Sequence, residues 1–193
     1  MTGKISTERL KELKEFCRSL NLHFKDYSLL DLAFHHCSFS NENRVEKYYN
    51  NERLEFLGDS VLGLAAADFL YQDMSSNHEE GDLAKIKATV VSEKSLAPIA
   101  LEFGIDRLLV LGHGEEMSGG RKKPAILADC MEAVIGAIFL DGGLDKAKEL
   151  KVKLSFDVNF RTDIFKDQET AIKTYLPFIN SADIVKFSDD ELL

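Results

Sequence analysis

The stretch NERLEFLGDSVLGL (residues 51–64) opens a long, strongly apolar helical pattern that continues to about Met74. Its apolar positions recur at steps of three and four, the period of one helix face. A second apolar stretch, ILADCMEAVIGAIFL (residues 126–140), follows Pro124, which suits the first position of a helix. We find no alternating pattern of useful length and no internal repeat. The sequence therefore predicts an all-α fold.

Turn and cap residues divide the rest of the chain into shorter segments. The caps expected for two N-terminal helices are Ser6 or Thr7 and Asp26 or Ser28. Residues 85–103 are expected to form two helices, and Gly142–Gly143 is expected to stop the helix that carries residues 126–140. The polar residues 38–51 are predicted to be a loop, and the glycine-rich residues 104–123 are predicted to be turns.

The two apolar helices carry acids where acids are uncommon. Glu52, Glu55 and Asp59 are spaced by three and then four residues, which places them on one helix face. Asp129 and Glu132 are again three apart, inside a run apolar enough to be buried. A buried carboxylate is costly unless something neutralises its charge or its pKa shifts. A divalent cation between the two helices would neutralise these acids, and oxygen ligands favour Mg²⁺ or Mn²⁺.

Plainer interpretations of the same acids exist. They can be solvated residues, and Glu52 in a first helical turn is favoured by the helix dipole. The buried setting of Asp129 and Glu132 argues against that interpretation for those two. The chemistry that fits the metal interpretation is attack of water on a phosphoester.

The residues that carry these acids resemble the ribonuclease III family of double-stranded-RNA endonucleases. The signature segment is NERLEFLGDSVLGL, and the similarity continues through three further stretches in the family's order. These are LLDLAFHHCSFSNE (29–42), EEGDLAKIKATVVSEKSLAPIA (79–100) and LLVLGHGEEMSGGRKKPAILADCMEAVIGAIFLDGG (108–143). Together they cover most of residues 20–160.

The resemblance implies roles for individual residues. The family's four catalytic carboxylates match Glu55, Asp59, Asp129 and Glu132, and all four are expected to bind the metal. Asp59 and Glu132 match the positions that are usually termed catalytic. Supporting acids match Glu52 and Glu80, and Phe56 matches a residue that packs into a partner subunit. The implied protein is a homodimeric helical endonuclease that uses Mg²⁺, or Mn²⁺ in its place. It would cut double-stranded RNA, such as ribosomal precursors and structured transcripts, to 5′-phosphate and 3′-hydroxyl ends.

Basic residues near these segments are candidates for RNA contacts. Arg121, Lys122 and Lys123 precede the helix of Asp129, where side chains and helix N-terminal amides can meet phosphates. Lys85 and Lys87 lie on one flank of their helix. Solvated surface cations are the plain alternative for all five.

Chain length predicts one domain, or one domain with a short extension. The resemblance implies that residues 1–160 form the catalytic domain and that residues 161–193 are an extension or linker. The second segment is too short and acidic to be a complete double-stranded-RNA-binding domain. Three cysteines without paired spacing suit the cytoplasm, and no stretch is long and apolar enough to span a membrane.

A net charge of −9 argues against a phosphate-rich partner unless a cation recruits it. Two alternatives remain open from the sequence alone. One is a catalytically silent RNA-binding relative, and the other is an all-helical metal phosphohydrolase that acts on nucleotides.

Overall fold

A computed structural model of the chain describes residues 5–43, 49–74, 79–149, 155–158 and 184–187. The N-terminal helices are α1 (Thr7–Ser19), α2 (Tyr27–Ala33), α3 (Cys37–Asn43) and α4 (Glu52–Met74). The next are α5 (Glu80–Val90), α6 (Glu93–Glu102), α7 (Ile105–Leu108) and α8 (His113–Met117). A 3₁₀ turn, η1 (Gly120–Lys122), then leads into α9 (Pro124–Glu149). The all-α prediction is confirmed for the domain that these helices form.

Helix boundaries follow the expected local chemistry. The Ser6 side chain accepts a hydrogen bond from the Arg9 amide at the start of α1, and Asp26 accepts one from the Ser28 amide at the start of α2. Pro124 is the first residue of α9, where its missing amide hydrogen costs no helical bond. Gly143, with φ 82°, breaks the helical path of α9 as expected from the Gly142–Gly143 pair.

Two regions differ from the sequence prediction. Part of the predicted loop forms α3, which is stabilised locally by hydrogen bonds from Ser40 to the Cys37 carbonyl and from Asn43 to the Phe39 carbonyl. The glycine-rich region contains α7, α8 and η1 rather than turns alone. Short helices of this kind depend on tertiary contacts, which a periodicity argument does not capture.

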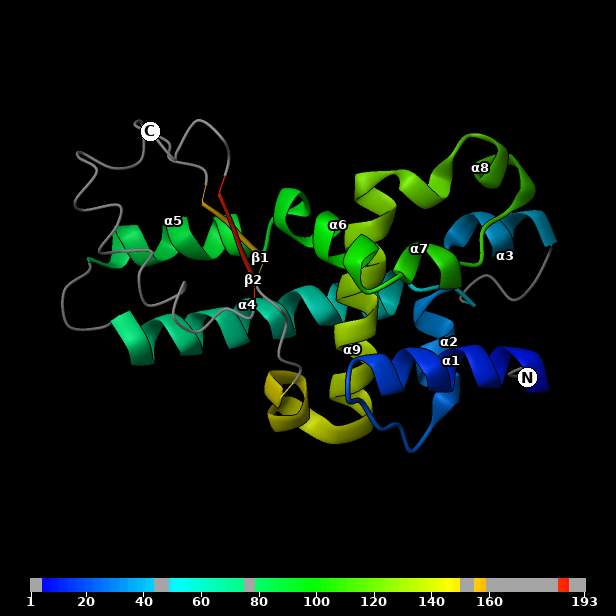
Figure 1. Ribbon diagram of the computed structural model, residues 1–193, viewed down its shortest axis with the longest axis horizontal. Helices are drawn as coiled ribbons and strands as arrows, with labels where there is room; N and C mark the ends of the chain where they lie inside the picture. Colours follow the sequence, from blue (N-terminus) through cyan, green and yellow to red (C-terminus); the bar gives the residue numbers. More distant parts are fainter. Residues whose placement is uncertain (1–4, 44–48, 75–78, 150–154, 159–183, 188–193) are drawn as a thin grey trace.

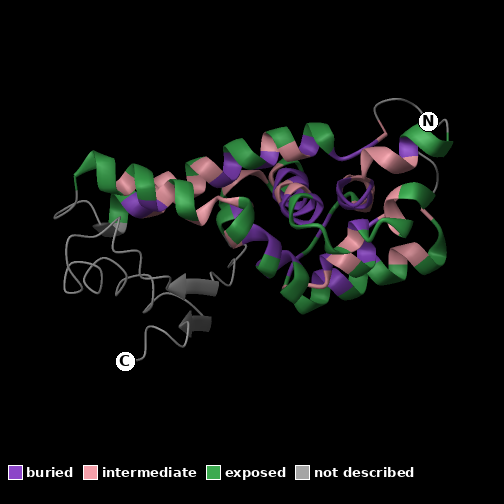
Figure 2. Cartoon of the chain, turned by 90° about the horizontal axis from the view of Figure 1, so that it is seen from above, coloured by how far each residue is buried: buried purple, intermediate pink, exposed green. Residues whose placement is uncertain are grey.

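The core gathers around α9, which crosses the N-terminal part of α4 (Figure 1). The rest of α4 runs beside α5 and extends away from the core, and Figure 2 shows that this extension is mainly half-buried and exposed. The largest fully buried side chains come from α1, α2, α6, α7, α9 and the residue after α2: Leu13, Leu30, Phe34, Leu96, Ile99, Ile105, Leu127, Met131, Val134 and Ile138.

Two four-residue strands follow the helices. β1 (Ser155–Val158) pairs in parallel with β2 (Ile184–Phe187), and Ser155 lies opposite Ile184. The alternation analysis did not predict these strands. They lie on opposite sides of the expected boundary at residue 160, and most of residues 161–193 lies outside the described part of the chain. Among the described helices, none is long and apolar enough to cross a membrane.

Candidate metal centre

Two glycines allow α4 and α9 to come into backbone contact where they cross. A Cβ atom added at Gly58 of α4 would lie 1.7 Å from the Glu132 carbonyl oxygen of α9. A Cβ atom at Gly136 of α9 would lie 2.3 Å from the Leu54 carbonyl oxygen of α4. Glycine in a helix interior costs about 1 kcal/mol relative to alanine, so its use here indicates a required close approach. This contact brings the acid-bearing turns of both helices together.

Three carboxylates meet beside the glycine contact. Glu55 comes from α4, one turn before Gly58, while Asp129 and Glu132 come from the first turns of α9. One oxygen atom from each side chain lies within 4.8 Å of the other two. All three side chains are half-buried. A single divalent cation can be reached by all three, because hard cations take several oxygen ligands from different side chains.

Burial and neighbouring acids raise the pKa values of the three clustered acids. Burial raises the pKa of Glu132 to about 7, and the charges of Asp59, Asp129 and Glu55 add to the rise. Burial likewise raises the pKa of Glu55, with Asp129, Glu52 and Asp59 contributing. In the described part of the chain, none of these acids forms an ion pair with a lysine or arginine.

Asp129 differs slightly from the other two acids of the site. Burial raises its pKa and Glu93 adds to the rise, whereas His36 opposes it. Burial and like charges raise the pKa values of carboxylates, and a bound cation lowers them again. The donor set therefore fits a divalent metal.

Two predicted acids lie at the edge of this group. Asp59 is exposed and is not one of the three clustered acids, but its charge makes the largest charge contribution to the raised pKa of Glu132. Glu52 is exposed in the first turn of α4, and one of its carboxylate oxygens accepts a hydrogen bond from Asn50 Nδ2 at 3.0 Å. Both acids thus contribute charge to the site.

The other predicted residues are more dispersed. Glu80 is exposed in the first turn of α5 and is not part of the three-acid cluster. Lys85 is exposed on the same helix with Asp82 Oδ1 3.7 Å from its Nζ, and Lys87 is half-buried. Phe56 projects from α4 with 78% of its surface exposed, which is unusual for a phenylalanine.

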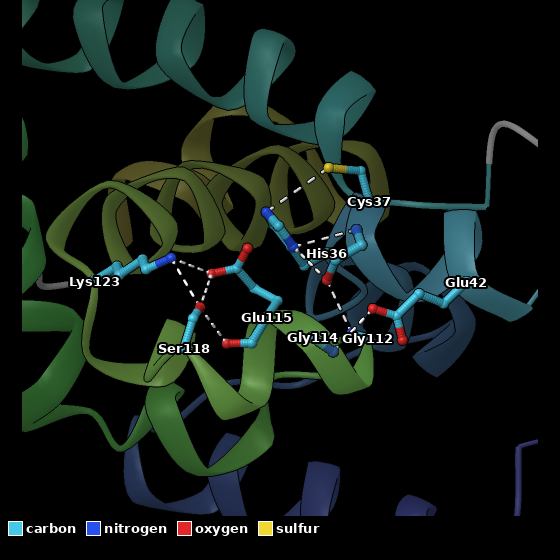
Figure 3. A network of polar contacts seen from close by, with 9 residues as sticks. His36, Cys37, Glu42, Gly112, Gly114, Glu115, Ser118 and Lys123 are labelled. Carbon is cyan, nitrogen blue, oxygen red and sulfur yellow. Dashed lines mark hydrogen bonds and ion pairs between the residues drawn. The ribbon is translucent and has the colours of Figure 1, made fainter.

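The basic turn before α9 is largely neutralised by acids of α8. The Arg121 guanidinium binds both oxygens of Glu116, at 2.8 and 2.7 Å, and also donates to the Asp106 carbonyl at 2.7 Å. Lys123 Nζ lies 2.6 Å from Glu115 Oε1 and 3.0 Å from Ser118 Oγ (Figure 3). Lys122 is exposed, and no ion pair of it is found within the described residues.

Sequence reasoning missed the residues that shape the site. Gly58 and Gly136 were present in the quoted stretches, and their position inside apolar helices was the available signal. Glu115 and Glu116 of α8 gave no comparable signal, because their pairing with the basic turn depends on the tertiary structure.

These features define an all-helical domain with a three-carboxylate site at the crossing of two helices. A family model of ribonuclease-III-like domains matches residues 26–156, and the chain belongs to this family. The ribonuclease 3 of Treponema denticola is 55% identical over 150 residues, which cover 78% of this chain and 60% of that protein. The ribonuclease 3 of Bacillus velezensis is 46% identical over 153 residues, covering 79% of this chain and 61% of the relative.

The chain thus spans about three fifths of the length of these two relatives. Among solved structures, the nuclease domain of ribonuclease III from Campylobacter jejuni matches with a TM-score of 0.67 at 42% identity. The match covers 74% of this chain and 94% of that chain. That structure is described as flexible in a region involved in dimer formation.

Proposed function

We propose that the chain is a divalent-metal-dependent endoribonuclease that hydrolyses phosphodiester bonds of double-stranded RNA. The observation that carries the proposal is the group formed by Glu55, Asp129 and Glu132, which is half-buried and has no compensating side-chain cation among the described residues. Family membership and the relatives named ribonuclease 3 support the same reaction. The products would carry 5′-phosphate and 3′-hydroxyl ends, and the substrates would be ribosomal precursors and structured transcripts.

Glu55, Asp129 and Glu132 would hold Mg²⁺, or Mn²⁺ in its place, with Asp59 at the open edge. The bound cation would polarise the phosphate and lower the pKa of a water molecule. The acids fix the position of the scissile phosphate relative to the two helices, and the exposed carboxylate of Asp59 is free to accept a proton or to orient water. Asp59 and Glu132 are the acids we assign to the chemical step.

Glu52 and Glu80 would support this site without binding the metal. Glu52 adds negative charge next to Glu55, as the raised pKa of Glu55 indicates. Glu80 is exposed in the first turn of α5 and lies outside the three-acid cluster, so its support would come from its charge. Among the basic residues, Lys122, Lys85 and Lys87 are the better candidates for phosphate contacts. Lys85 has only an exposed ion pair of 3.7 Å, whereas Arg121 and Lys123 are held by acids at 2.7 and 2.6 Å.

We propose that two copies pair through the exposed apolar face of α4. Phe56, Leu64 and Tyr71 are 78%, 55% and 72% exposed, and they follow one another at near-helical spacing along this helix. A homodimer would cover this face and give two sites for the two RNA strands. Light scattering should show twice the mass of the single chain, and a monomer at high concentration would count against this part of the proposal.

The proposal places catalysis in residues 1–160 and treats residues 161–193 as an extension. It also places the protein in the cytoplasm, because Cys17, Cys37 and Cys130 are free, as suits a reducing compartment. RNA binding by the catalytic part is expected to be weak and steeply dependent on salt, because most contacts would go to phosphates.

The deciding experiment incubates the purified chain with labelled duplex RNA and, separately, with nucleoside triphosphates in Mg²⁺. We expect cleavage of the duplex and none of the triphosphates. Hydrolysis of triphosphates alone would indicate a nucleotide phosphohydrolase, and binding of duplex RNA without cleavage would indicate a silent relative. Single-stranded RNA of the same sequence serves as the substrate control.

A further inference from the structure

Lys123, at the end of the basic turn, is held by an acid of α8. Its Nζ atom lies 2.6 Å from Glu115 Oε1 and 3.0 Å from Ser118 Oγ (Figure 3). The Ser118 hydroxyl donates in turn to the Glu115 carbonyl at 2.9 Å. The ammonium group thus contacts α8 and the residue that caps it, and both contacts depend on where the Glu115 segment lies.

Gly120 gives the Glu115 side chain the space to reach Lys123. A Cβ atom added at Gly120 would lie 2.7 Å from Glu115 Cγ and 2.8 Å from both its carbonyl oxygen and Oε1. The φ angle of Gly120 is not positive, so its backbone conformation does not require glycine. The close approach of Glu115 accounts for the glycine instead. The ion pair is therefore built into the turn.

The second ion pair of the turn has a further anchor. The Arg121 guanidinium binds both oxygens of Glu116 and also donates to the Asp106 carbonyl of α7 at 2.7 Å. Without the Glu115 charge, Lys123 would keep only a neutral hydroxyl partner among the described residues. The Lys123 side chain is also 47% exposed, against 34% for Arg121. Lys123 is thus the more easily released of the two cations.

Lys123 stands at the start of the helix that carries two acids of the carboxylate site. Its carbonyl accepts the Leu127 N–H at 3.1 Å, and Pro124 begins α9. Asp129 follows six residues later, about 9 Å along the helix axis. Lys122, next to Lys123, is exposed and forms no ion pair with the described residues. A phosphate chain that reaches the acids over the start of α9 would meet both lysines.

We infer that Glu115 blocks Lys123 from binding the phosphates of RNA, because its carboxylate occupies the ammonium group that would otherwise bind a phosphate oxygen. The inference rests on the proposed RNA substrate. Carboxylate and phosphate oxygens compete for the same lysine donors. While the ion pair is intact, Lys123 releases no counterion when RNA binds. Glu115 thus limits how many cations of the turn contact RNA and leaves that contact to Lys122.

Binding of duplex RNA in chelator, measured by filter binding at several salt concentrations, tests the block without any cleavage. Glu115→Gln should make the slope of log affinity against log salt steeper by about one, and it should tighten binding at low salt. Glu116→Gln is the matched control, because it removes the same charge from the same helix while Arg121 keeps its contact with the Asp106 carbonyl. Its slope should equal that of the unsubstituted chain.

Removal of Lys123 shows whether this lysine causes the steeper slope. Glu115→Gln combined with Lys123→Ala should return the slope to that of the unsubstituted chain, and Lys123→Ala alone should not change it. The inference is overturned if Glu115→Gln leaves the slope unchanged, or if Glu116→Gln steepens it equally. A steeper slope that persists in the combined variant would also overturn it.

Lysine acylation by an N-hydroxysuccinimide ester, followed by mass spectrometry, tests the block without RNA. Lys123 should react more slowly than Lys122 in the unsubstituted chain and at a similar rate in Glu115→Gln. This variant should fold, because an ion pair this exposed contributes little stability, and thermal melting checks it. If the unsubstituted chain binds no duplex RNA, the proposed function fails and acylation still tests the block. Equal Lys123 acylation in both proteins would contradict it.

Discussion

Charged side chains are unpaired where α4 crosses α9, whereas they are paired in the basic turn between α8 and α9. At the crossing, Glu55, Asp129 and Glu132 stand close together, and burial and neighbouring acids raise their pKa values. At the turn, Arg121 and Lys123 are each matched to an acid of α8. Paired charges fix the shape of the turn, whereas unpaired charges at the crossing leave the site dependent on a ligand. The acids at the crossing therefore carry a local free-energy cost that a bound cation would remove.

The largest effect is expected from Glu132→Gln, which keeps the shape of the side chain and removes its charge. Cleavage of duplex RNA should fall by more than about 100-fold, the upper end for residues that only support a metal ligand. The metal-free protein should not lose stability, because the lost charge is uncompensated. Single-turnover cleavage and thermal melting measure the two quantities.

Glu116→Gln is the matched control at the turn, since it removes a charge that is paired with Arg121. It should melt at a lower temperature than the unsubstituted chain and retain most of its cleavage rate. A reversed pattern, with Glu116 needed for cleavage and Glu132 needed for stability, would overturn the contrast between the two regions.

The next effect concerns the glycine contact that brings the helices together. Gly58→Ala should lower the free energy of unfolding by about 3 kcal/mol, the upper range for overpacking, because its Cβ would overlap the Glu132 carbonyl. Chemical denaturation measures this loss. Gly81→Ala in α5 is the control, since no atom lies within 4 Å of its added Cβ, and it should gain up to about 1 kcal/mol. Similar results for both would show that close approach does not explain Gly58.

A pH series tests the uncompensated charge at the crossing. The pKa of Glu132 is about 7 in the folded protein and near its ordinary value of 4.5 when unfolded. The folded state therefore binds more protons between these values, and the contribution of Glu132 to stability falls as pH rises through that window. Burial lowers the pKa values of His35 and His36, so their contributions change in the opposite direction.

The difference between the unsubstituted chain and Glu132→Gln isolates the contribution of Glu132. With chelator present, the variant should gain stability relative to the unsubstituted chain as pH rises from 5 to 8. Denaturant titrations at several pH values measure this difference. A difference that stays constant across the series would mean that the Glu132 charge is compensated.

The smallest effects are expected from single cations of the basic turn. Lys122→Ala should reduce the slope of log affinity for duplex RNA against log salt by about one, as for a lysine that contacts one phosphate. Arg121→Ala should leave that slope unchanged and reduce stability by at most about 1 kcal/mol, because its ion pair is partly exposed. Filter binding at several salt concentrations measures the slopes. Equal slopes for both variants would remove Lys122 from the RNA contacts.

Sequence periodicity and cap chemistry were sufficient to predict α1, α2, α4 and α9, because each follows from local side-chain patterns. The acids of the crossing were also accessible, since charged residues inside apolar helices conflict with burial. α3 and α8 were not predicted as helices, because they are short and depend on contacts between them, such as Glu42 with the Gly114 amide. The ion pairs of Arg121 and Lys123 in the basic turn could not be predicted for the same reason.

The central claim is that the acids of the α4–α9 crossing together bind a divalent cation. Electron paramagnetic resonance of Mn²⁺ added to the unsubstituted chain, to Asp129→Asn and to Glu132→Gln tests it most directly. Our account predicts saturable binding by the unsubstituted chain and greatly weakened binding by both variants. Equal binding by all three proteins would show that the cation, if it binds at all, is held elsewhere.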